Sequence, residues 1–261
     1  MKEEPEFFDK YLKFKGEIAE GPIFHKEEIL RKEDKKAYIV KKIKQTKFSK
    51  LILTGLIEDL STFVSLSSEL KNPYIIKIED QFLSNDNLIL VESKMTMNLE
   101  ECMNSKEDVL SPEELRRLIC ISVYALNDLM VQGKKFHINL KPQNILLDEF
   151  HYPRITDFYG IKNAFLLFGE VKSKDTQKWC APEIGNFFEI SKKELLVLFK
   201  KVDFSLCMVF TLGLLFLSLF RREEFRSFPH KYLKCWKTKA VKERAITSLL
   251  TSLRKDSECE G

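Results

Sequence analysis

The chain has 261 residues, of which 44% are apolar, so it can bury a substantial core and is not a disordered segment. Lysine and arginine number 43 against 39 aspartate and glutamate residues, and the resulting charge of only +4 argues against a nucleic-acid-binding protein. Glycine is scarce, with nine residues where average usage of about 7% would give roughly eighteen. The chain therefore has few of the glycines that flexible, phosphate-binding loops need.

The cysteines and the N-terminus favour a cytoplasmic protein. The six cysteines form no Cys-x-x-Cys pair and have no histidine at metal-ligand spacing, which is typical of reduced thiols. The first eight residues carry three glutamates, whereas a secretory signal needs a basic start and an apolar core. We therefore expect cytoplasmic localisation and no secretion.

Along the chain, the first part is strand-rich. Apolar runs predict strands at residues 38–43, 74–78 and 88–91, and a helical stretch over about residues 57–70 interrupts them. This order predicts a small sheet that carries one helix.

The pattern becomes helical from Ser111 onward. Ser111 supplies an N-cap, Pro112 the first helical position and Glu114 the partner of a capping box, ahead of an apolar face that runs to Leu129. With no linker rich in proline, glycine or serine, the two halves are expected to form one compact unit of the α+β class.

The segment from Phe204 to Phe220 is uncharged over seventeen residues. That length is at the lower limit for crossing a membrane, and Ser205, Thr211 and Ser218 add hydroxyl groups. We favour a helix buried in the core, with a membrane anchor as the alternative.

Three motifs follow one another in the second half. They are His137-Ile-Asn-Leu-Lys-Pro-Gln-Asn144, Asp157-Phe-Tyr-Gly and Trp179-Cys-Ala-Pro-Glu183. Their order, and the thirteen positions from Asn144 to Asp157, resemble the protein-kinase family, whose signatures are H-R-D-L-x-x-x-N, D-F-G and A-P-E.

The resemblance covers residues 12 to about 255 and implies a two-lobed protein-kinase-like fold. It implies a small antiparallel-sheet N-lobe with one helix at 12–91, a hinge at 92–96 and a larger, mainly helical C-lobe at 97–261 with a shortened end. Residues 1–11 are then an N-terminal extension. The resemblance also implies ATP and Mg²⁺ as weakly bound cofactors, and a protein partner or protein substrate. The Lys-Pro pair is more similar to the serine/threonine branch of the family.

The same resemblance implies the roles of individual residues. Asn139 stands at the position of the catalytic aspartate, with Lys141 beside it, and Asn144 and Asp157 are the expected Mg²⁺ ligands. The expected nucleotide-binding residues are Ile18, Gly21, Lys26, Lys41, Glu92, Lys94, Asn144 and Asp157.

The phosphate loop departs from the family pattern. Ala19 and Phe24 stand where the first and third glycines belong, and Pro22 removes a backbone N–H. A working nucleotide lid and an ordinary hairpin both remain open for this segment. Tyr159 likewise replaces the glycine of D-F-G.

The catalytic loop and the helix of the small lobe also differ from the family pattern. Asn139 carries an amide, which cannot accept a proton as a carboxylate does, and Ile138 replaces the arginine that would read an activation-loop phosphate. The glutamate that the family pairs with Lys41 is replaced by Phe63, with Asp59 one helical turn away, so we expect that ion pair to be absent.

The central helix of the C-lobe can be aligned in two ways. One alignment places Met208 at the position of the family's aspartate, and the rival places Asp203 there.

Three functions are compatible with these residues. The leading hypothesis is a catalytically impaired kinase-like domain, a pseudokinase, with residual Mg-ATP binding and a signalling or scaffolding role. The alternative is an active, divergent serine/threonine kinase that transfers the γ-phosphate of ATP to protein, because Lys41, Lys141, Asn144 and Asp157 are retained. The third is an interaction module that binds no nucleotide.

Overall fold

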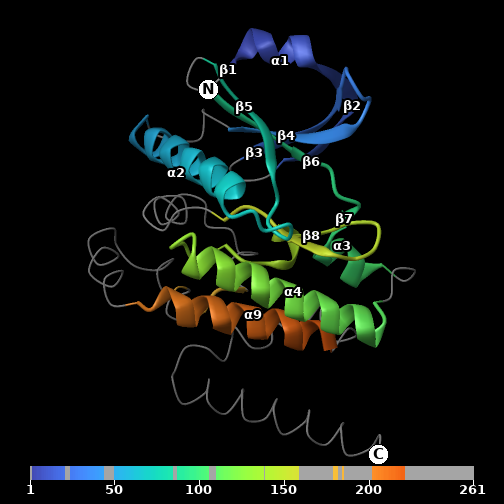
Figure 1. The fold of residues 1–261 in the computed structure, drawn as a ribbon, viewed down its shortest axis with the longest axis vertical. Coiled ribbons are helices and arrows are strands. Elements are labelled where there is room, and N and C mark those ends of the chain that lie inside the picture. Colours follow the sequence, from blue (N-terminus) through green and yellow to red (C-terminus); the bar gives the residue numbers. More distant parts are fainter. Residues whose placement is uncertain are drawn as a thin grey trace, which may run out of the picture.

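The computed structural model describes residues 2–20, 24–43, 50–84, 87–105, 110–137, 139–158, 179–181, 184 and 202–220. A sheet-based small lobe stands above a helical large lobe (Figure 1). The strands are β1 (Lys2–Glu3), β2 (Tyr11–Glu20), β3 (Phe24–Arg31), β4 (Ala37–Ile43), β5 (Ile78–Ser84), β6 (Asn87–Ser93), β7 (Met97–Asn98), β8 (Ile145–Leu147) and β9 (Pro153–Ile155). The helices are α1 (Glu4–Lys10), α2 (Lys50–Glu69), α3 (Leu99–Asn104), α4 (Pro112–Val131), the 3₁₀ turn η2 (Pro142–Asn144) and α9 (Phe204–Phe220). This architecture confirms the predicted α+β class and the two lobes.

The small lobe is built on a sheet of order β1-β5-β6-β4-β3-β2. All pairs are antiparallel except β1 with β5, which is parallel. The strands predicted at 38–43 and 88–91 are confirmed within β4 and β6, and the predicted helix is confirmed as α2, which begins at Lys50.

The strand predicted at 74–78 is wrong for most of its length, because β5 begins only at Ile78. Instead, the backbone N–H of Ile76 donates to the carbonyl of Ile155, and the backbone N–H of Ile155 donates to the carbonyl of Tyr74. The backbone groups of this segment are therefore satisfied by β9 of the large lobe, which ties the two lobes together.

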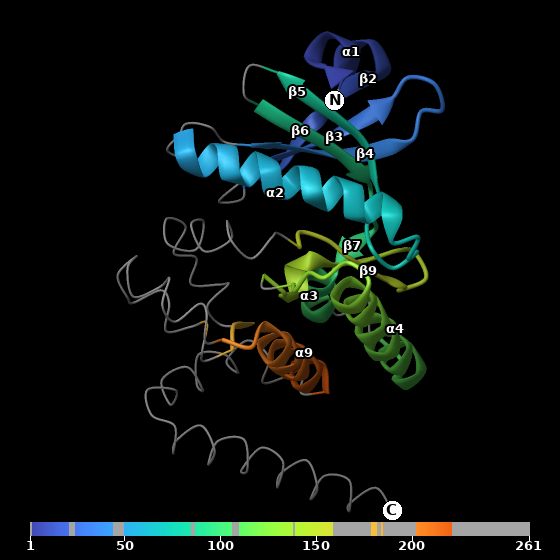
Figure 2. The same ribbon diagram turned by 60° about the vertical axis from the view of Figure 1, so that its left-hand side comes forward.

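The two faces of the sheet are covered differently. Figure 2 shows α2 across one face and α1 on the opposite side. Side chains alternate between the faces. Tyr38 and Val40 of β4 therefore join the cluster beneath α1, whereas Ile43 packs in the cluster that includes α2. Phe24, which stands where the third glycine of the phosphate loop belongs, begins β3 and is buried in this second cluster.

The segment that was predicted as an N-terminal extension packs as part of the small lobe. Phe7 of α1 is only 4% exposed, and its ring meets the edge of Phe82 with centroids 5.3 Å apart. The Tyr11 hydroxyl and the Lys10 ammonium both contact the carboxylate of Asp80 in β5. Residues 2–11 thus contribute an edge strand, a helix and a polar anchor to the sheet.

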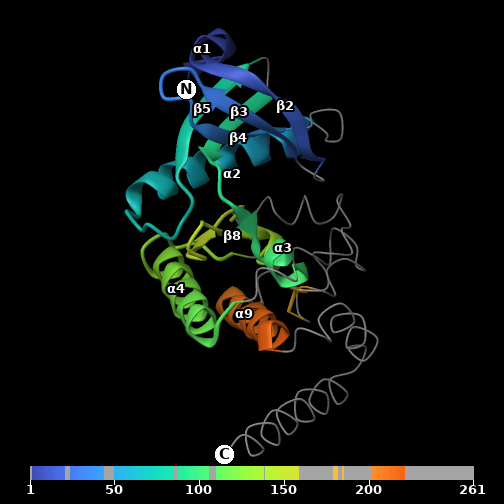
Figure 3. The same ribbon diagram turned by 90° about the vertical axis from the view of Figure 1, so that its right-hand side faces the viewer.

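In the large lobe, the helix predicted from Ser111 is confirmed as α4. The Ser111 hydroxyl accepts from the Glu114 N–H, and the Glu114 carboxylate accepts from the Ser111 N–H, which completes the capping box. Helix α9 lies beside α4 in all views, and α3 and β8 lie between these helices and the small lobe (Figure 3).

Helix α9 has the bounds expected of the uncharged segment, and it packs in the core, as favoured. It is not buried on every side, since Leu206 and Val209 are exposed. Within the described ranges, no helix is both long and apolar enough to cross a membrane.

The two residues that the alignments of α9 offer lie at different places in the structure. The Asp203 carboxylate accepts from the backbone N–H groups of Ser205 and Leu206, so it caps the helix N-terminus. Met208 lies inside the helix and is buried.

The packing of α1 yields a stability prediction. We expect Phe7→Ala to lower the free energy of unfolding by about 3 kcal/mol or more, because truncating a buried phenylalanine removes its contacts and leaves a cavity. The matched control is Phe8→Ala, since Phe8 is 57% exposed and its truncation should cost less than about 0.5 kcal/mol. Urea unfolding measures both, and equally small losses would contradict the docking of α1.

Candidate functional site

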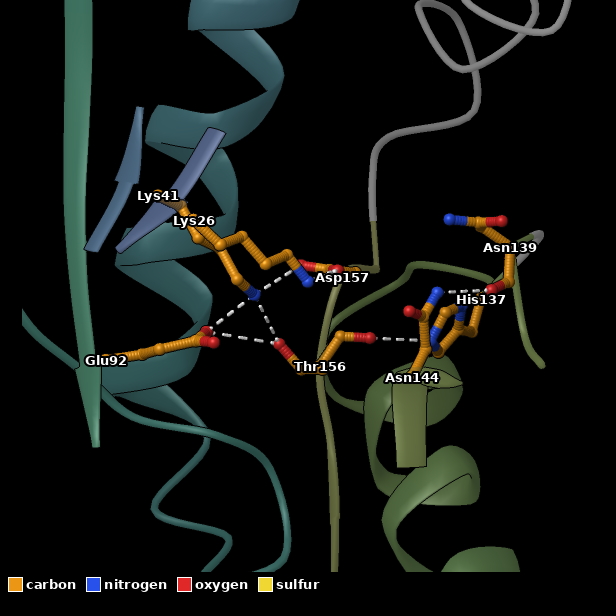
Figure 4. A network of polar contacts seen from close by, with 8 residues as sticks. All are labelled: Lys26, Lys41, Glu92, His137, Asn139, Asn144, Thr156 and Asp157. Atoms are coloured by element: carbon orange, nitrogen blue, oxygen red, sulfur yellow. Dashed lines mark hydrogen bonds and ion pairs between the residues drawn. The ribbon is translucent and has the colours of Figure 1, made fainter. Parts of the chain in front are cut away.

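Five stretches of the chain meet between the lobes. They are strands β3 and β4, the end of β6, residues 156–158 directly after β9, and residues 137 and 139–144, which precede β8 (Figure 4). Each contributes polar side chains to one network. Since most of these side chains are buried, their contacts define the chemistry of the site.

Lys41 is the centre of this network. Its side chain is 2% exposed, and its Nζ lies 2.8 Å from Glu92 Oε2, 2.7 Å from Asp157 Oδ1 and 3.2 Å from the Thr156 hydroxyl. An ammonium group has three N–H donors, so all three are used. Burial by itself would lower the pKa of Lys41, but the charges of Asp157 and Glu92 raise it above its usual value, so the amine is protonated at neutral pH.

Glu92 belongs to strand β6, although it was predicted as the first residue of the hinge. The strand continues to Ser93, and Glu92 is 3% exposed. Its carboxylate accepts from Lys41 and from the Thr156 hydroxyl, at 2.8 and 3.3 Å. Its side chain therefore faces the interior of the site.

Lys26 lies directly across from Lys41, as its Cα partner in the β3–β4 pair. Like charges that face each other across strands repel, so both need anions nearby. Asp157 provides one, because its second oxygen lies 3.6 Å from Lys26 Nζ. Burial alone would raise the pKa of Asp157, but the charges of Lys41 and Lys26 hold it well below its usual range. Two cations and two carboxylates thus alternate through the site.

Asp157 has a left-handed backbone with φ of 59°, a conformation that aspartate adopts more readily than most residues. The carbonyl of the preceding Thr156 accepts from His137 Nε2 at 2.9 Å. The following Phe158 meets the edge of Phe63, with ring centroids 4.4 Å apart. Phe63 therefore packs on Phe158, and the carboxylate partners of Lys41 come from outside α2 among the residues whose side chains are described.

The loop before β8 brings Asn144 and Asn139 together. Asn144 Nδ2 donates to the backbone carbonyl of Asn139 at 2.7 Å, while the side chain of Asn139 points away from Asn144 (Figure 4). The amide oxygen of Asn144 is turned toward Asp157.

The donor chemistry of Asn144 and Asp157 fits Mg²⁺, which prefers carboxylate and carbonyl oxygens. Both oxygens of Asp157 already face lysines, so a cation would compete with Lys41 and Lys26 for this carboxylate. In the described part of the chain there is no group of three or more His, Cys, Asp or Glu side chains that could hold a metal ion without further ligands.

Four predicted site residues remain, and they are Lys94, Lys141, Ile18 and Gly21. Lys94 pairs with Glu28 through both carboxylate oxygens, each at 2.8 Å, at the exposed rim. Lys141 directly precedes η2, and its carbonyl accepts from the Asn144 N–H. Ile18 lies in β2. Gly21 is outside the described residues, as are Pro22, Ile138 and Tyr159.

A family model for the protein kinase domain matches residues 13–249. The chain belongs to the protein kinase family.

Several curated protein kinases are similar to part of this kinase domain. It is 29% identical over 155 residues to the serine/threonine-protein kinase fused of Drosophila melanogaster, a match covering 59% of this chain and 18% of that protein. It is 30% identical over 146 residues to the carbon catabolite-derepressing protein kinase of Saccharomyces cerevisiae, covering 56% of this chain and 22% of the relative. It is 33% identical over 102 residues to cyclin-dependent kinase 7 of Carassius auratus, covering 39% and 29%. The matches thus span less than a third of the length of each relative.

Within the kinase domain, the structure brings together five of the predicted nucleotide-binding residues, Lys26, Lys41, Glu92, Asn144 and Asp157. Thr156, which contacts both Lys41 and Glu92, was missed by the sequence analysis. No sequence pattern marks this threonine, because its contacts depend on how the two lobes meet.

His137 is buried beside Thr156, the residue that precedes Asp157. Burial lowers the pKa of His137 to about 4, although its bond to the Thr156 carbonyl and the nearby charge of Asp157 oppose the shift. The imidazole is therefore neutral at pH 7. Its Nδ1 is buried without a hydrogen-bond partner among the described residues.

This depressed pKa predicts a pH-dependent stability. The unfolded chain binds a proton near pH 6.5 and the folded chain only near pH 4, so stability is lost as the pH falls between these values. We expect the contribution of His137 to drop by about 2 kcal/mol between pH 7 and pH 5. Urea unfolding at the two pH values measures it, and a His137→Phe variant should lack this part of the loss. An identical pH dependence in both proteins would contradict the neutral, buried state of His137.

Proposed function

We propose that this kinase domain is catalytically impaired, binds Mg-ATP weakly and acts in signalling through a protein partner. The observation that carries the proposal is the amide of Asn139 at the catalytic-base position. The loop around it is well held, because Asn144 bonds the Asn139 carbonyl and Thr156 donates its N–H to the Asn144 carbonyl. A residue is therefore presented at that position, but it cannot take the proton of a substrate hydroxyl.

The loss of a positioned general base has a known scale. Such a group contributes about 10² to 10⁴ in rate, which corresponds to roughly 3 to 5 kcal/mol of barrier. Phosphoryl transfer depends mainly on positioning and charge stabilisation, so the remaining groups would support at most slow turnover.

Weak nucleotide binding follows from the state of Lys41. Because its three donors are taken by Glu92, Asp157 and Thr156, a phosphate oxygen must displace one of them or share a hydrogen. Asn144 and Asp157 would hold Mg²⁺, which when bound neutralises phosphate charge. Lys26 would have to leave Asp157 for this to happen, and it could then face the phosphates.

The alternative, an active and divergent serine/threonine kinase, is favoured by one feature. Lys41 Nζ lies 2.7 Å from Asp157 Oδ1. The hydrogen bond between His137 and the Thr156 carbonyl supports the backbone next to Asp157. The groups that would align a nucleotide are thus in contact even though the base is absent. The serine/threonine kinase relatives support this branch if transfer occurs.

A phosphotransfer assay separates these functions. With labelled ATP, Mg²⁺ or Mn²⁺ and generic serine/threonine substrates, we expect wild-type turnover to be no greater than that of Lys41→Ala. Wild-type turnover that disappears in Lys41→Ala would overturn the impaired function. If it also rose by about 10² or more in Asn139→Asp, the active alternative would be supported.

Thermal stability with nucleotide tests the remaining part of the proposal. A ligand present at about ten times its dissociation constant adds about 1.4 kcal/mol, and one at 100 times adds about 2.7 kcal/mol. We expect millimolar ATP with Mg²⁺ to give a stabilisation near the smaller value, and Asp157→Asn to remove its Mg²⁺-dependent part. Complete absence of stabilisation in the wild type would favour an interaction module that binds no nucleotide.

A further inference from the structure

Glu92 is a carboxylate in an apolar strand. The four residues before it, Leu88 to Val91, are buried in alternation under the two faces of the sheet. Leu90 and Glu92 are two residues apart and therefore share the inner face. A charge in such a place is strongly unfavourable unless it is paired and hydrogen-bonded.

The register of the sheet provides that pairing. Lys41 is the Cα partner of Leu90, and Ile39 is the partner of Glu92, so Lys41 and Glu92 are diagonal neighbours on adjacent strands. Diagonal neighbours lie about 7–8 Å apart at their Cα atoms, within reach of two long side chains. The two side chains do meet, since Lys41 Nζ lies 2.8 Å from Glu92 Oε2.

We propose that Glu92 is the residue that positions Lys41, taking from strand β6 the role that a carboxylate on helix α2 would otherwise have. Three observations carry the proposal: the diagonal strand register, the burial of both side chains, and the second bond from the Thr156 hydroxyl that fixes the Glu92 carboxylate. Phe63 of α2 is meanwhile occupied by its contact with Phe158.

A lysine that is held by the adjacent strand moves with the sheet, whereas a lysine that is held by a helix depends on the position of that helix. β4 and β6 are joined by the backbone ladder over Tyr38 to Lys42, so the two residues move as one unit. Displacement of α2 would then leave the position of Lys41 unchanged. This inference deepens the proposed function, but it concerns the lysine itself, so it can fail while the impaired activity stands.

The test observes the Lys41 ammonium group directly. In protein labelled with ¹⁵N at lysine Nζ, a buried ammonium with three acceptors should give a slowly exchanging resonance at neutral pH, assigned by its loss in Lys41→Arg. We expect Glu92→Gln to speed its hydrogen exchange with water by about tenfold to a hundredfold, because a hydrogen bond to a charged acceptor is lost. The conservative Glu92→Asp should restore part of the protection.

Matched carboxylate-to-amide changes on α2 are the controls. Glu58→Gln and Asp59→Asn should leave the Lys41 resonance and its exchange rate unchanged. Glu92→Met provides a second variant if Glu92→Gln does not fold, since an apolar side chain avoids an unpaired buried amide, and it should give the same faster exchange. Faster exchange in Asp59→Asn, an unchanged rate in the folded Glu92 variants, or no protected resonance in the wild type would each overturn the proposal.

Discussion

The arrangement of the two lobes at the site depends on the ion pairs and hydrogen bonds of the buried Lys41 ammonium group. One cation joins strand β4 to β6 through Glu92 and joins the small lobe to the large lobe through Thr156 and Asp157. Burying these charges is favourable only while each has its partners, because a single unpaired charge in this environment costs several kcal/mol. The network therefore behaves as a unit, and changing one member alters the electrostatics of all the others.

The loop beside this network shows how a kinase fold could keep its shape under the altered chemistry that we propose. The hydrogen bonds from His137 to the Thr156 carbonyl and from Asn144 to the Asn139 carbonyl both use backbone acceptors. Neither of these two bonds involves the side chain at position 139.

Local signals made much of the fold predictable. The capping box at Ser111 and the apolar run at 88–91 depend on neighbouring residues only, and the motif spacing identified Asn144 and Asp157. The segment 74–78 was assigned wrongly because its backbone pairs with β9, a partner that no local pattern reveals. The position of Glu92 was partly predictable. An uninterrupted apolar strand implies two buried faces, so a carboxylate that comes next on the inner face needs a cation as its partner. That this cation is Lys41 follows only from the strand register, which the sequence does not give.

The parallel strand β1 and helix α1 have a practical consequence for making the protein. A recombinant fragment that starts at residue 12, where the sequence resemblance begins, would lack the partner of β5 and the ring of Phe7. It would expose both an unpaired strand edge and the aromatic surface around Phe82 and Tyr38. Such surfaces promote association between chains. Expression of the domain should therefore retain the first eleven residues.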